Sequence, residues 1–344
     1  METRELLDTH PYRLFDITHS DRDDQQVIFV DEVQYLKNPS NFLKLIYDMF
    51  NQNIKLVVSW SSSFYIDQKF KDSLMGRKKM FELFTLDFEE FLDFKDEQEI
   101  KKLMFDKKII PITTSDKSKI DQLFSEYITY GWYPEVVLTK EKEEKKKLLK
   151  TLSSDYIKKD IYEANIDWAD TFLWILKVLA GQIWELVNVN DLSKTFRADH
   201  KTVNKYLYIM KKSYSIALIK PFWSNVKAEL TKMPKVFFLD LGLKNSLIDD
   251  FRGIHERLDK GHYFENILWR ELILRHGIDE VNYRRTAQDN EVDFIVNEKI
   301  AYEAKFSENL IAKSKYTLFR ENYPNIPLEF ITFDTVLEKI ILEK

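Results

Sequence analysis

Apolar residues form short continuous runs near the start of the chain. Residues 27–31 read Val-Ile-Phe-Val-Asp, and residues 54–59 form a second run of this kind. Because apolar runs of this length are typical of strands buried in a parallel sheet, both runs predict such strands. A helical segment at Ser40 to Phe50 separates them, and strand character returns at Phe81 to Leu86 after a helical stretch that ends at Gly76. This alternation predicts an α/β layer in about the first ninety residues.

The middle of the chain is helical in pattern, and mixed character follows it. Residues 88–166 have helical periodicity, and we interpret the charged run Lys140 to Lys147 as a solvated helix face. The elements expected after this part are helices and a strand over residues 169–223, a strand at Lys235, a long helix around Phe264 to His276, a hairpin at 291–305, a helix, and a strand near Phe330.

Length and composition limit the classes of protein that fit. A chain of 344 residues is too long for one ordinary core, and 44% hydrophobic with 32% charged residues is a globular composition. The absence of cysteine excludes disulfide frameworks and zinc–thiolate sites. We expect a cytoplasmic protein with no membrane partner, because no apolar run approaches a membrane span and no signal peptide begins the chain. The net charge of −5 means that any contact with nucleic acid needs a local basic patch.

An acidic pair, Asp31 and Glu32, closes the first apolar run. The carboxyl end of a parallel strand is where α/β folds bind ligands. In ATPases the Asp of such a pair holds Mg²⁺ and the Glu orients the attacking water, although a capped turn is the commoner alternative. The chain has only seven glycines, none before Gly76, and it contains no GxxxxGK[ST] or GxGxxG phosphate loop.

Further short motifs follow the acidic pair in a fixed order. They are Val27 to Gln34, Ser59 to Ser63, Gly76-Arg77, Leu83 to Phe91, Gly131 to Glu135, Asp155 to Asp160 and Asp240 to Leu243. Over nearly the whole chain this series resembles prokaryotic AAA-type ATPases fused to a C-terminal domain of unknown function. The resemblance implies ATP with Mg²⁺ as ligands, and it implies these cofactor-binding residues: Asp31, Glu32, Ser61 and Arg77.

Two features depart from that family. Trp60 stands where the family has a glycine, and the strand, Walker A loop and helix that open the family's ATPase domain are missing. The backbone N–H groups and the Lys of that loop hold the β- and γ-phosphates, so we expect this polypeptide alone to bind ATP poorly. Two hypotheses account for the missing loop: a truncated reading frame, or a split pair or oligomer in which a partner chain supplies it.

Residues 199–213 predict a helix with an inward apolar face and an outward basic face. The inward positions are Val203, Tyr206, Leu207 and Met210. A helix before it and a β-prone segment after it predict a winged helix. The basic residues expected to contact nucleic-acid phosphates are Lys201, Lys205, Lys211 and Lys212. The alternatives are an ordinary solvated face or a protein-contact module.

The C-terminal region carries the most specific chemistry. Asp293, followed at 303–305 by Glu-Ala-Lys, resembles the core of PD-(D/E)xK nucleases, and Glu265 matches the helical glutamate of many such enzymes. Catalysis there needs hard oxygen ligands for Mg²⁺ and a cation near the attacking water. The resemblance implies Asp293 and Glu303 as metal ligands, and it implies these catalytic residues: Glu265, Asp293, Glu303 and Lys305.

Strand parity tests this prediction independently. If the turn holds Asn297 to Lys299, then Val296 pairs with Ile300 and Asp293 lies opposite Glu303. A two-residue turn would instead place the two acids on opposite faces. One expected face is apolar and contains Val292, Phe294, Val296, Ile300, Tyr302 and Ala304. The other is the expected site face and contains Glu291, Asp293, Ile295, Ala301, Glu303 and Lys305. The alternative is an ordinary hairpin whose charges face water.

Together these observations predict a multidomain α/β protein that acts on nucleic acid. The alternative is a non-catalytic module that binds nucleic acid or protein, with a decayed ATPase. The predicted segments are a partial P-loop-type parallel sheet at 1–95, a helical connector at 96–168, a winged helix at 169–234, and a restriction-endonuclease-like α/β domain at 235–344.

Overall fold

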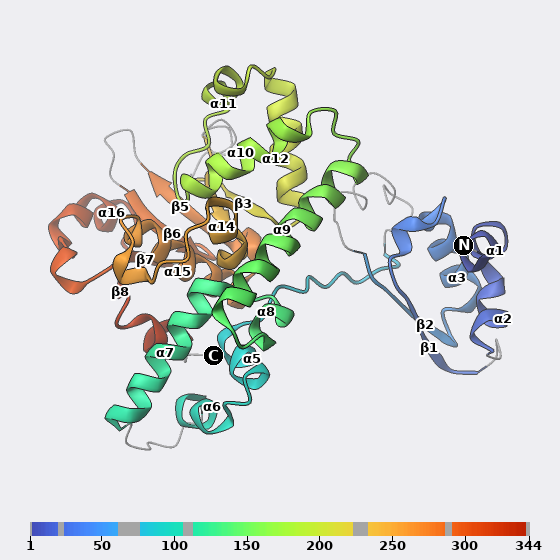
Figure 1. Ribbon diagram of the computed structural model, residues 1–344, viewed down its shortest axis with the longest axis horizontal. Coiled ribbons are helices and arrows are strands. Elements are labelled where there is room, and N and C mark those ends of the chain that lie inside the picture. The colour runs from blue at the N-terminus through green and yellow to red at the C-terminus, as the bar shows by residue number, and fades with distance from the viewer. Residues whose placement is uncertain are drawn as a thin grey trace. The chain divides into compact units, whose positions relative to one another are not determined.

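The computed structural model describes residues 2–19, 24–60, 76–105, 113–222, 233–285 and 291–341. The chain divides into two compact units, shown in Figure 1. The first unit comprises residues 1–83 together with 212–214, and the second comprises 84–211 together with 215–344. The fold class is α/β, because helices are combined with several small sheets. The four predicted segments remain predictions, and three of them lie mainly in the second unit.

The first unit contains a two-stranded parallel sheet and helices against one of its faces. Pro39 begins the crossover helix, and the side chain of Asn38 caps it by accepting a hydrogen bond from the N–H of Asn41. The predicted helix at 40–50 and the two predicted strands are therefore confirmed. The label η marks a short helix that is not an α-helix: a 3₁₀ helix in most cases, and a π-helix for η7 (Leu337–Ile341). The elements of this unit are α1 (Glu2–Thr9), η1 (Pro11–Arg13), α2 (Leu14–Thr18), β1 (Gln26–Val30), η2 (Val33–Tyr35), α3 (Pro39–Phe50) and β2 (Ile54–Val58).

One face of this sheet is covered and the other is open. Ile28 and Ile54 point into a core that is formed with the helices of the same unit. On the opposite face Phe29 is 75% exposed and Val27 is 53% exposed. The prediction of a strand buried on both faces is therefore wrong for β1, since only alternate residues meet a helix layer.

The segment from Phe81 to Leu86 does not form the predicted strand. The backbone there is irregular, and Leu83 is almost completely exposed. A strand requires a neighbour to pair with its N–H and C=O groups. Leu86 instead donates its N–H to the carbonyl of Trp132, so this backbone bonds to a turn and not to a sheet. The helical stretch predicted to end at Gly76 lies outside the described residues.

The second unit begins with a layer of helices, as the periodicity of residues 88–166 predicts. Capping boxes fix two helix starts, with Asp87 and Glu90 at one and Thr113 and Asp116 at the other. The helices of this layer are α5 (Phe88–Phe94), α6 (Gln98–Phe105), α7 (Thr114–Tyr130), α8 (Pro134–Leu138) and α9 (Lys142–Glu163).

The charged run at the start of α9 is not uniformly solvated. Lys145 is fully buried, and its ammonium donates to the carbonyls of Val136 and Val137 at the end of α8. Glu126 of α7 pairs with it at 3.2 Å. The prediction of a solvated face is therefore wrong at this position, because α8 packs across the first turn of α9 and its free carbonyls need a donor.

Two of the sequence motifs meet in a tight contact within this unit. The carboxylate of Asp240 accepts the N–H of Trp132 at 2.7 Å and caps α14 (Leu241–Ile248) through the N–H of Leu243 at 2.8 Å. A Cβ on Gly242 would lie 2.1 Å from the carbonyl oxygen of Tyr130. These two motifs therefore join α7 to α14, and glycine is required for their close approach.

The next part of the second unit combines helices with a small antiparallel sheet. β3 (Ile216–Ile219) pairs with β4 (Lys235–Phe238), and Leu186 forms an antiparallel bridge to Lys235. The predicted helix at 199–213 and the strand after it are confirmed. The helices that precede the strands are α10 (Ala169–Gly181), α11 (Val189–Phe196) and α12 (His200–Lys212).

The last part of the second unit is a four-stranded sheet of order β5-β6-β7-β8. The first three strands are antiparallel, and β8 runs parallel to β7 (Figure 1). The predicted long helix, hairpin, helix and final strand are all present. The elements are η3 (Ile254–Glu256), α15 (Lys260–His276), η4 (Ile278–Glu280), β5 (Val281–Arg285), β6 (Glu291–Val296), β7 (Ile300–Lys305), η5 (Glu308–Leu310), η6 (Lys313–Tyr316), α16 (Thr317–Asn322), β8 (Leu328–Thr332) and η7 (Leu337–Ile341).

Candidate functional site

The hairpin of β6 and β7 has the register that strand parity predicts. Val296 pairs with Ile300 across a three-residue turn. Asn297 and Glu298 have φ values of 51° and 57°, in the left-handed region that such turns use. The prediction of a three-residue turn is therefore confirmed.

The predicted separation of the hairpin into an apolar and an acidic face is only partly correct. The pairing of β5 with β6 shifts between Asn282 and Arg284, which marks a β-bulge. Beyond the bulge Val292 packs with Ile295 and Ala301, although strict alternation would place it on the other face. An extra residue in a strand reverses its alternation, so the sequence pattern failed at this point.

Asp293, Glu303 and Lys305 converge on one buried centre. The N–H of Ala304 donates to Asp293 Oδ2 at 2.8 Å, and the N–H of Asp293 donates to Glu303 Oε2 at 3.3 Å. Lys305 pairs with Glu303, and its ammonium lies 3.9 Å from Asp293 Oδ2. Only 4% of Asp293 and 2% of Glu303 is exposed, so these charges do not face water as the ordinary-hairpin alternative requires.

Helix α15 contributes Glu265 to the same centre. This side chain is buried, and its Oε2 has no hydrogen-bond partner among the described residues. Its carboxylate interacts electrostatically with those of Asp293 and Glu303. The structure therefore brings together all four predicted catalytic residues. Hereafter Glu265, Asp293, Glu303 and Lys305 are called the acidic centre.

Burial makes the ionised carboxylates of the acidic centre costly. Burial and, after it, the neighbouring charge of Asp293 together raise the pKa of Glu303 to about 7, against the opposing effects of Lys305 and Tyr316. Burial likewise raises the pKa of Asp293 and, with the Asp293 charge, the pKa of Glu265. Burial alone would lower the pKa of Lys305, but Asp293 and Glu303 raise it overall. A cation placed among these oxygens would stabilise their ionised forms.

Sequence reasoning missed Lys235, and it placed Glu291 on the expected site face without a role; both residues extend this cluster. Lys235 is 2% exposed, forms an ion pair with Glu291, and has its ammonium 3.3 Å from the centroid of the Trp184 ring. Burial lowers its pKa to about 7, against the opposing effect of the Asp293 charge. The signal in the sequence was a lysine at the start of an otherwise apolar strand, since a buried lysine needs an anionic partner.

The cluster as a whole is suited to a hard cation. Three cations, Lys235, Lys305 and Arg285, face four carboxylates, so the fully ionised cluster carries one negative charge more than positive. Among the described residues no group of three or more His, Asp or Glu side chains is arranged to hold a metal ion. Mg²⁺, however, keeps most of its water and is usually bound by one or two carboxylates. Asp293 and Glu303 would supply those two carboxylates.

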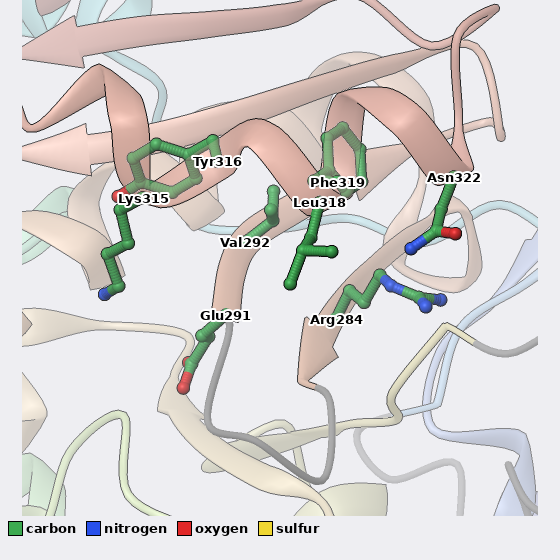
Figure 2. A pocket seen from close by; sticks show the side chains of 8 residues that line it. All are labelled: Arg284, Glu291, Val292, Lys315, Tyr316, Leu318, Phe319 and Asn322. Atoms are coloured by element: carbon green, nitrogen blue, oxygen red, sulfur yellow. The ribbon is translucent and has the colours of Figure 1, made fainter.

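A small pocket lies beside the acidic centre, between β5, β6 and α16 (Figure 2). Tyr316 lines it with its ring, while the hydroxyl of the same side chain donates to Glu303. Glu291 lines it as well and pairs with Lys235. Two residues of the pocket wall therefore touch residues of the cluster. The lining residues are Arg284, Glu291, Val292, Lys315, Tyr316, Leu318, Phe319 and Asn322.

The outward face of α12 carries the predicted basic residues. Lys201, Lys205 and Lys211 are exposed, and Lys212 is half-buried. The predicted inward positions of the helix are buried without exception. The amphipathic pattern is therefore confirmed, while the role of the lysines remains a prediction.

The acidic pair of the first unit is held by local hydrogen bonds. The Ser59 hydroxyl donates to Asp31, and the N–H of Glu32 donates to the Ser59 hydroxyl at 3.1 Å. Glu32 has a left-handed backbone with φ of 52°, which places it in a turn. This geometry agrees with the capped-turn alternative.

Of the other two predicted cofactor residues, the structure describes only Arg77, which pairs with a residue outside this acidic pair. Arg77 pairs at 2.8 Å with Asp48 of α3, and Ser61 lies outside the described residues. No helix within the described part of the chain is long and apolar enough to cross a membrane.

Comparison with known families supports the N-terminal assignment. Residues 2–92 match the family described as an AAA domain, and residues 121–253 match a domain of unknown function (DUF8612). The second match runs from within α7 to just beyond α14, so it includes the contact between Asp240 and Trp132. The acidic centre lies outside both matches.

Two relatives extend the similarity along the chain. An uncharacterized protein of Methanocaldococcus jannaschii is 25% identical over 276 residues, which cover 78% of this chain and 58% of that protein. An uncharacterized protein of Haemophilus influenzae is 23% identical over 310 residues, which cover 86% of this chain and 70% of that protein. No solved structure gives a significant match.

Proposed function

We propose that the second unit cuts nucleic acid with the help of Mg²⁺, and that the chain joins this nuclease-like module to an AAA-type ATPase-like module. The observation that carries the proposal is the convergence of Asp293, Glu303 and Lys305 with Glu265 in one buried cluster. These residues come from two strands and a helix, and the centre combines hard oxygen ligands with an ammonium group. A purely structural role does not account for this cluster, because burying several carboxylates together costs free energy of folding.

Each residue has a specific role in this proposal. Asp293 and Glu303 hold the cation, which supplies charge against the scissile phosphate and lowers the pKa of a bound water. Glu265 accepts a hydrogen bond from that water through its free Oε2. Lys305, the most accessible member of the centre, donates to the attacking oxygen. Tyr316 keeps Glu303 in place.

The winged-helix prediction belongs to the same proposal. Helices α10, α11 and α12 are followed by β3 and β4, and Leu186 bridges to β4 as a short third strand. This order supports a winged helix whose exposed lysines at 201, 205 and 211 position the nucleic acid through its phosphates.

Nucleotide binding by this chain is proposed to be impaired. The sequence has no glycine-rich phosphate loop, and Asp31 is already engaged by Ser59. ATP would then require a loop from a partner chain in an oligomer or a split pair. Millimolar ATP should leave the melting temperature of this chain unchanged, because only ligands that bind the folded state stabilise it. A clear rise in melting temperature would contradict this part of the proposal.

A cleavage assay tests the nuclease function. We expect the purified chain to cut single- or double-stranded DNA only when Mg²⁺ is present, and Asp293→Ala to lose at least a hundredfold in rate, since several kcal/mol of charge stabilisation are removed. Asp279→Ala, which changes an exposed acid of the same domain, is the matched control. Equal rates in both variants would exclude a role for the acidic centre in cleavage.

The alternative function is a non-catalytic module that binds nucleic acid or protein. It is favoured by the absence of a ready three-acid metal group among the described residues, and by Lys305, which already pairs with Glu303. This alternative predicts salt-dependent DNA binding without turnover. The double variant Lys201→Gln/Lys205→Gln should weaken such binding, whereas Lys142→Gln/Lys147→Gln on exposed α9 positions should not. Equal binding by the two double variants would exclude the contact through α12.

A further inference from the structure

The acidic centre cannot by itself attract a polyanion. It holds three carboxyl groups against one ammonium group, so no net positive charge is left to draw a phosphodiester backbone. Lys235 is buried and Lys305 is paired with Glu303, so both positive charges are already neutralised within the cluster. The local affinity for the part of a strand next to the centre must therefore come from cations that border the centre.

The pocket beside the centre supplies two such cations. Figure 2 shows Lys315 on one side of the pocket and Arg284 on the other, with Val292 and Leu318 between them in this view. The guanidinium of Arg284 lies 4.4 Å from the centroid of the Tyr323 ring and donates to the hydroxyl of that tyrosine. Arg284 is thus oriented in advance, which reduces the entropy cost when it binds an anion.

The remaining lining indicates the chemical class of the ligand. Val292 and Phe319 form an apolar wall, and Leu318 is half exposed at its edge. The acid of the lining, Glu291, is paired with Lys235. Asn322 adds an amide that can donate and accept. A free phosphate uses only the cations, whereas a nucleotide also places its sugar or base on the apolar wall.

We propose that this pocket is a subsite for a nucleotide next to the cleaved bond of a nucleic-acid strand. This inference rests on the proposed nuclease function, which it deepens by naming how the strand is held. Arg284 and Lys315 bind the phosphates on either side of that nucleotide, and Leu318 contacts its sugar or base. Tyr316 connects the subsite to the acidic centre, because its ring lines the pocket while its hydroxyl orients Glu303.

Binding without cleavage tests the subsite. A short labelled single-stranded oligodeoxynucleotide is titrated with the full chain in the absence of divalent cations, over a range of salt concentrations. For Arg284→Gln/Lys315→Gln we expect Kd to rise about tenfold or more, and the slope of log Kd against log salt to fall by about 0.7 for each phosphate that the variant no longer neutralises. Lys299→Gln/Lys313→Gln removes the same charge from exposed positions outside the pocket lining and should leave both quantities unchanged.

Three comparisons complete the test. Arg284→Lys keeps the positive charge and should retain binding. Lys315→Gln alone changes an exposed side chain and should weaken binding without affecting folding. A folding defect caused by Arg284→Gln therefore does not decide the result. A mononucleotide should displace the oligonucleotide at lower concentration than inorganic phosphate does; equal displacement would show that the apolar wall makes no contact. If the two double variants change Kd and its salt dependence equally, the proposal of a subsite is wrong.

The outcome also separates this inference from the proposed function. If Asp293→Ala abolishes cleavage while the pocket variants bind normally, the subsite is wrong and the nuclease function stands. If the pocket variants lose binding and the wild-type chain never cleaves, the subsite stands as part of a non-catalytic binding module.

Discussion

The two units both place acidic residues in or next to strands, yet the surroundings of these residues differ. Asp31 and Glu32 follow β1 in a turn, where hydrogen bonds with Ser59 fix both residues. Asp293 and Glu303 lie within β6 and β7, where burial raises the pKa of each carboxyl group. A buried, perturbed acidic group is the stronger candidate for a functional site, which favours the acidic centre over the pair that follows β1.

The same contrast holds for the two sheets. The β1–β2 pair has helices on one face and exposed Val27 and Phe29 on the other. The four-stranded sheet has buried residues on both faces, and α15 packs against β5, β6 and β7. A parallel pair normally needs cover on both faces, so the second unit has the more complete core.

The largest expected effect on stability comes from Gly242→Ala in the second unit. The new Cβ would lie 2.1 Å from the carbonyl oxygen of Tyr130, which is backbone and cannot move aside cheaply. We expect a loss of about 3 kcal/mol or more in the free energy of unfolding, measured by urea denaturation. Gly181→Ala has open space around its Cβ and is the control, with an expected change below about 1 kcal/mol. A small loss for Gly242→Ala would show that α7 and α14 are less tightly joined than the structure indicates.

The next largest effect is expected on the pH dependence of the free energy of unfolding of the second unit. Burial raises the pKa of Asp240 from 3.8 to about 6, against the effect of hydrogen bonds from Leu243 and Trp132. Because the unfolded chain loses this proton first, the folded state binds more protons between about pH 4 and pH 6, and stability falls as pH rises through that window. The expected loss is up to about 3 kcal/mol, from about 1.4 kcal/mol for each pKa unit.

Urea denaturation at several pH values measures this dependence, and Asp240→Asn should remove the part that Asp240 contributes, while the buried carboxyl groups of the acidic centre keep theirs. In the wild type each side-chain oxygen of Asp240 accepts a backbone N–H, one from Trp132 and one from Leu243. In Asp240→Asn the amide N–H₂ replaces one of these oxygens, so one backbone N–H loses its acceptor. At low pH the variant should therefore be less stable than the wild type. A wild-type chain whose stability rises steadily from pH 4 to pH 6 would contradict the assignment.

The smallest effects are expected on the open face of the first unit. Ile28→Ala removes a buried side chain of β1 and should cost about 2 kcal/mol or more, whereas Phe29→Ala changes an exposed neighbour and should stay within about 0.5 kcal/mol. The two variants differ by one position in the same strand, so the pair measures the asymmetry of the sheet directly. If Phe29→Ala costs as much as Ile28→Ala, the outer face is covered in solution.

Much of the acidic centre could be predicted from the sequence because strand geometry is local. The spacing of Asp293 to Glu303 and a three-residue turn fix the register of the hairpin, and the two-residue separation of Glu303 and Lys305 fixes their common face. The β-bulge was missed because no glycine or proline marks it. Its consequence, the packing of Val292 with Ile295, depends on the neighbouring strand β5.

Other features depend on contacts between distant segments and could not be predicted. Lys235 is 56 positions from Glu291 in the sequence, and only the fold brings them together. Lys145 looked solvated within its charged run, but packing of α8 buries it. The failed strand at Phe81 to Leu86 has the composition of a strand, but it pairs with no strand in the part of the chain that the structure describes.

The most direct test of the account is calorimetric titration of the chain with Mn²⁺, which prefers the same oxygen ligands as Mg²⁺. We expect binding that Asp293→Asn weakens at least tenfold and that Asp31→Asn, in the locally bonded pair, leaves unchanged. Loss of Mn²⁺ binding in Asp31→Asn with normal binding in Asp293→Asn would contradict the central claim, as would a wild-type chain that binds no Mn²⁺.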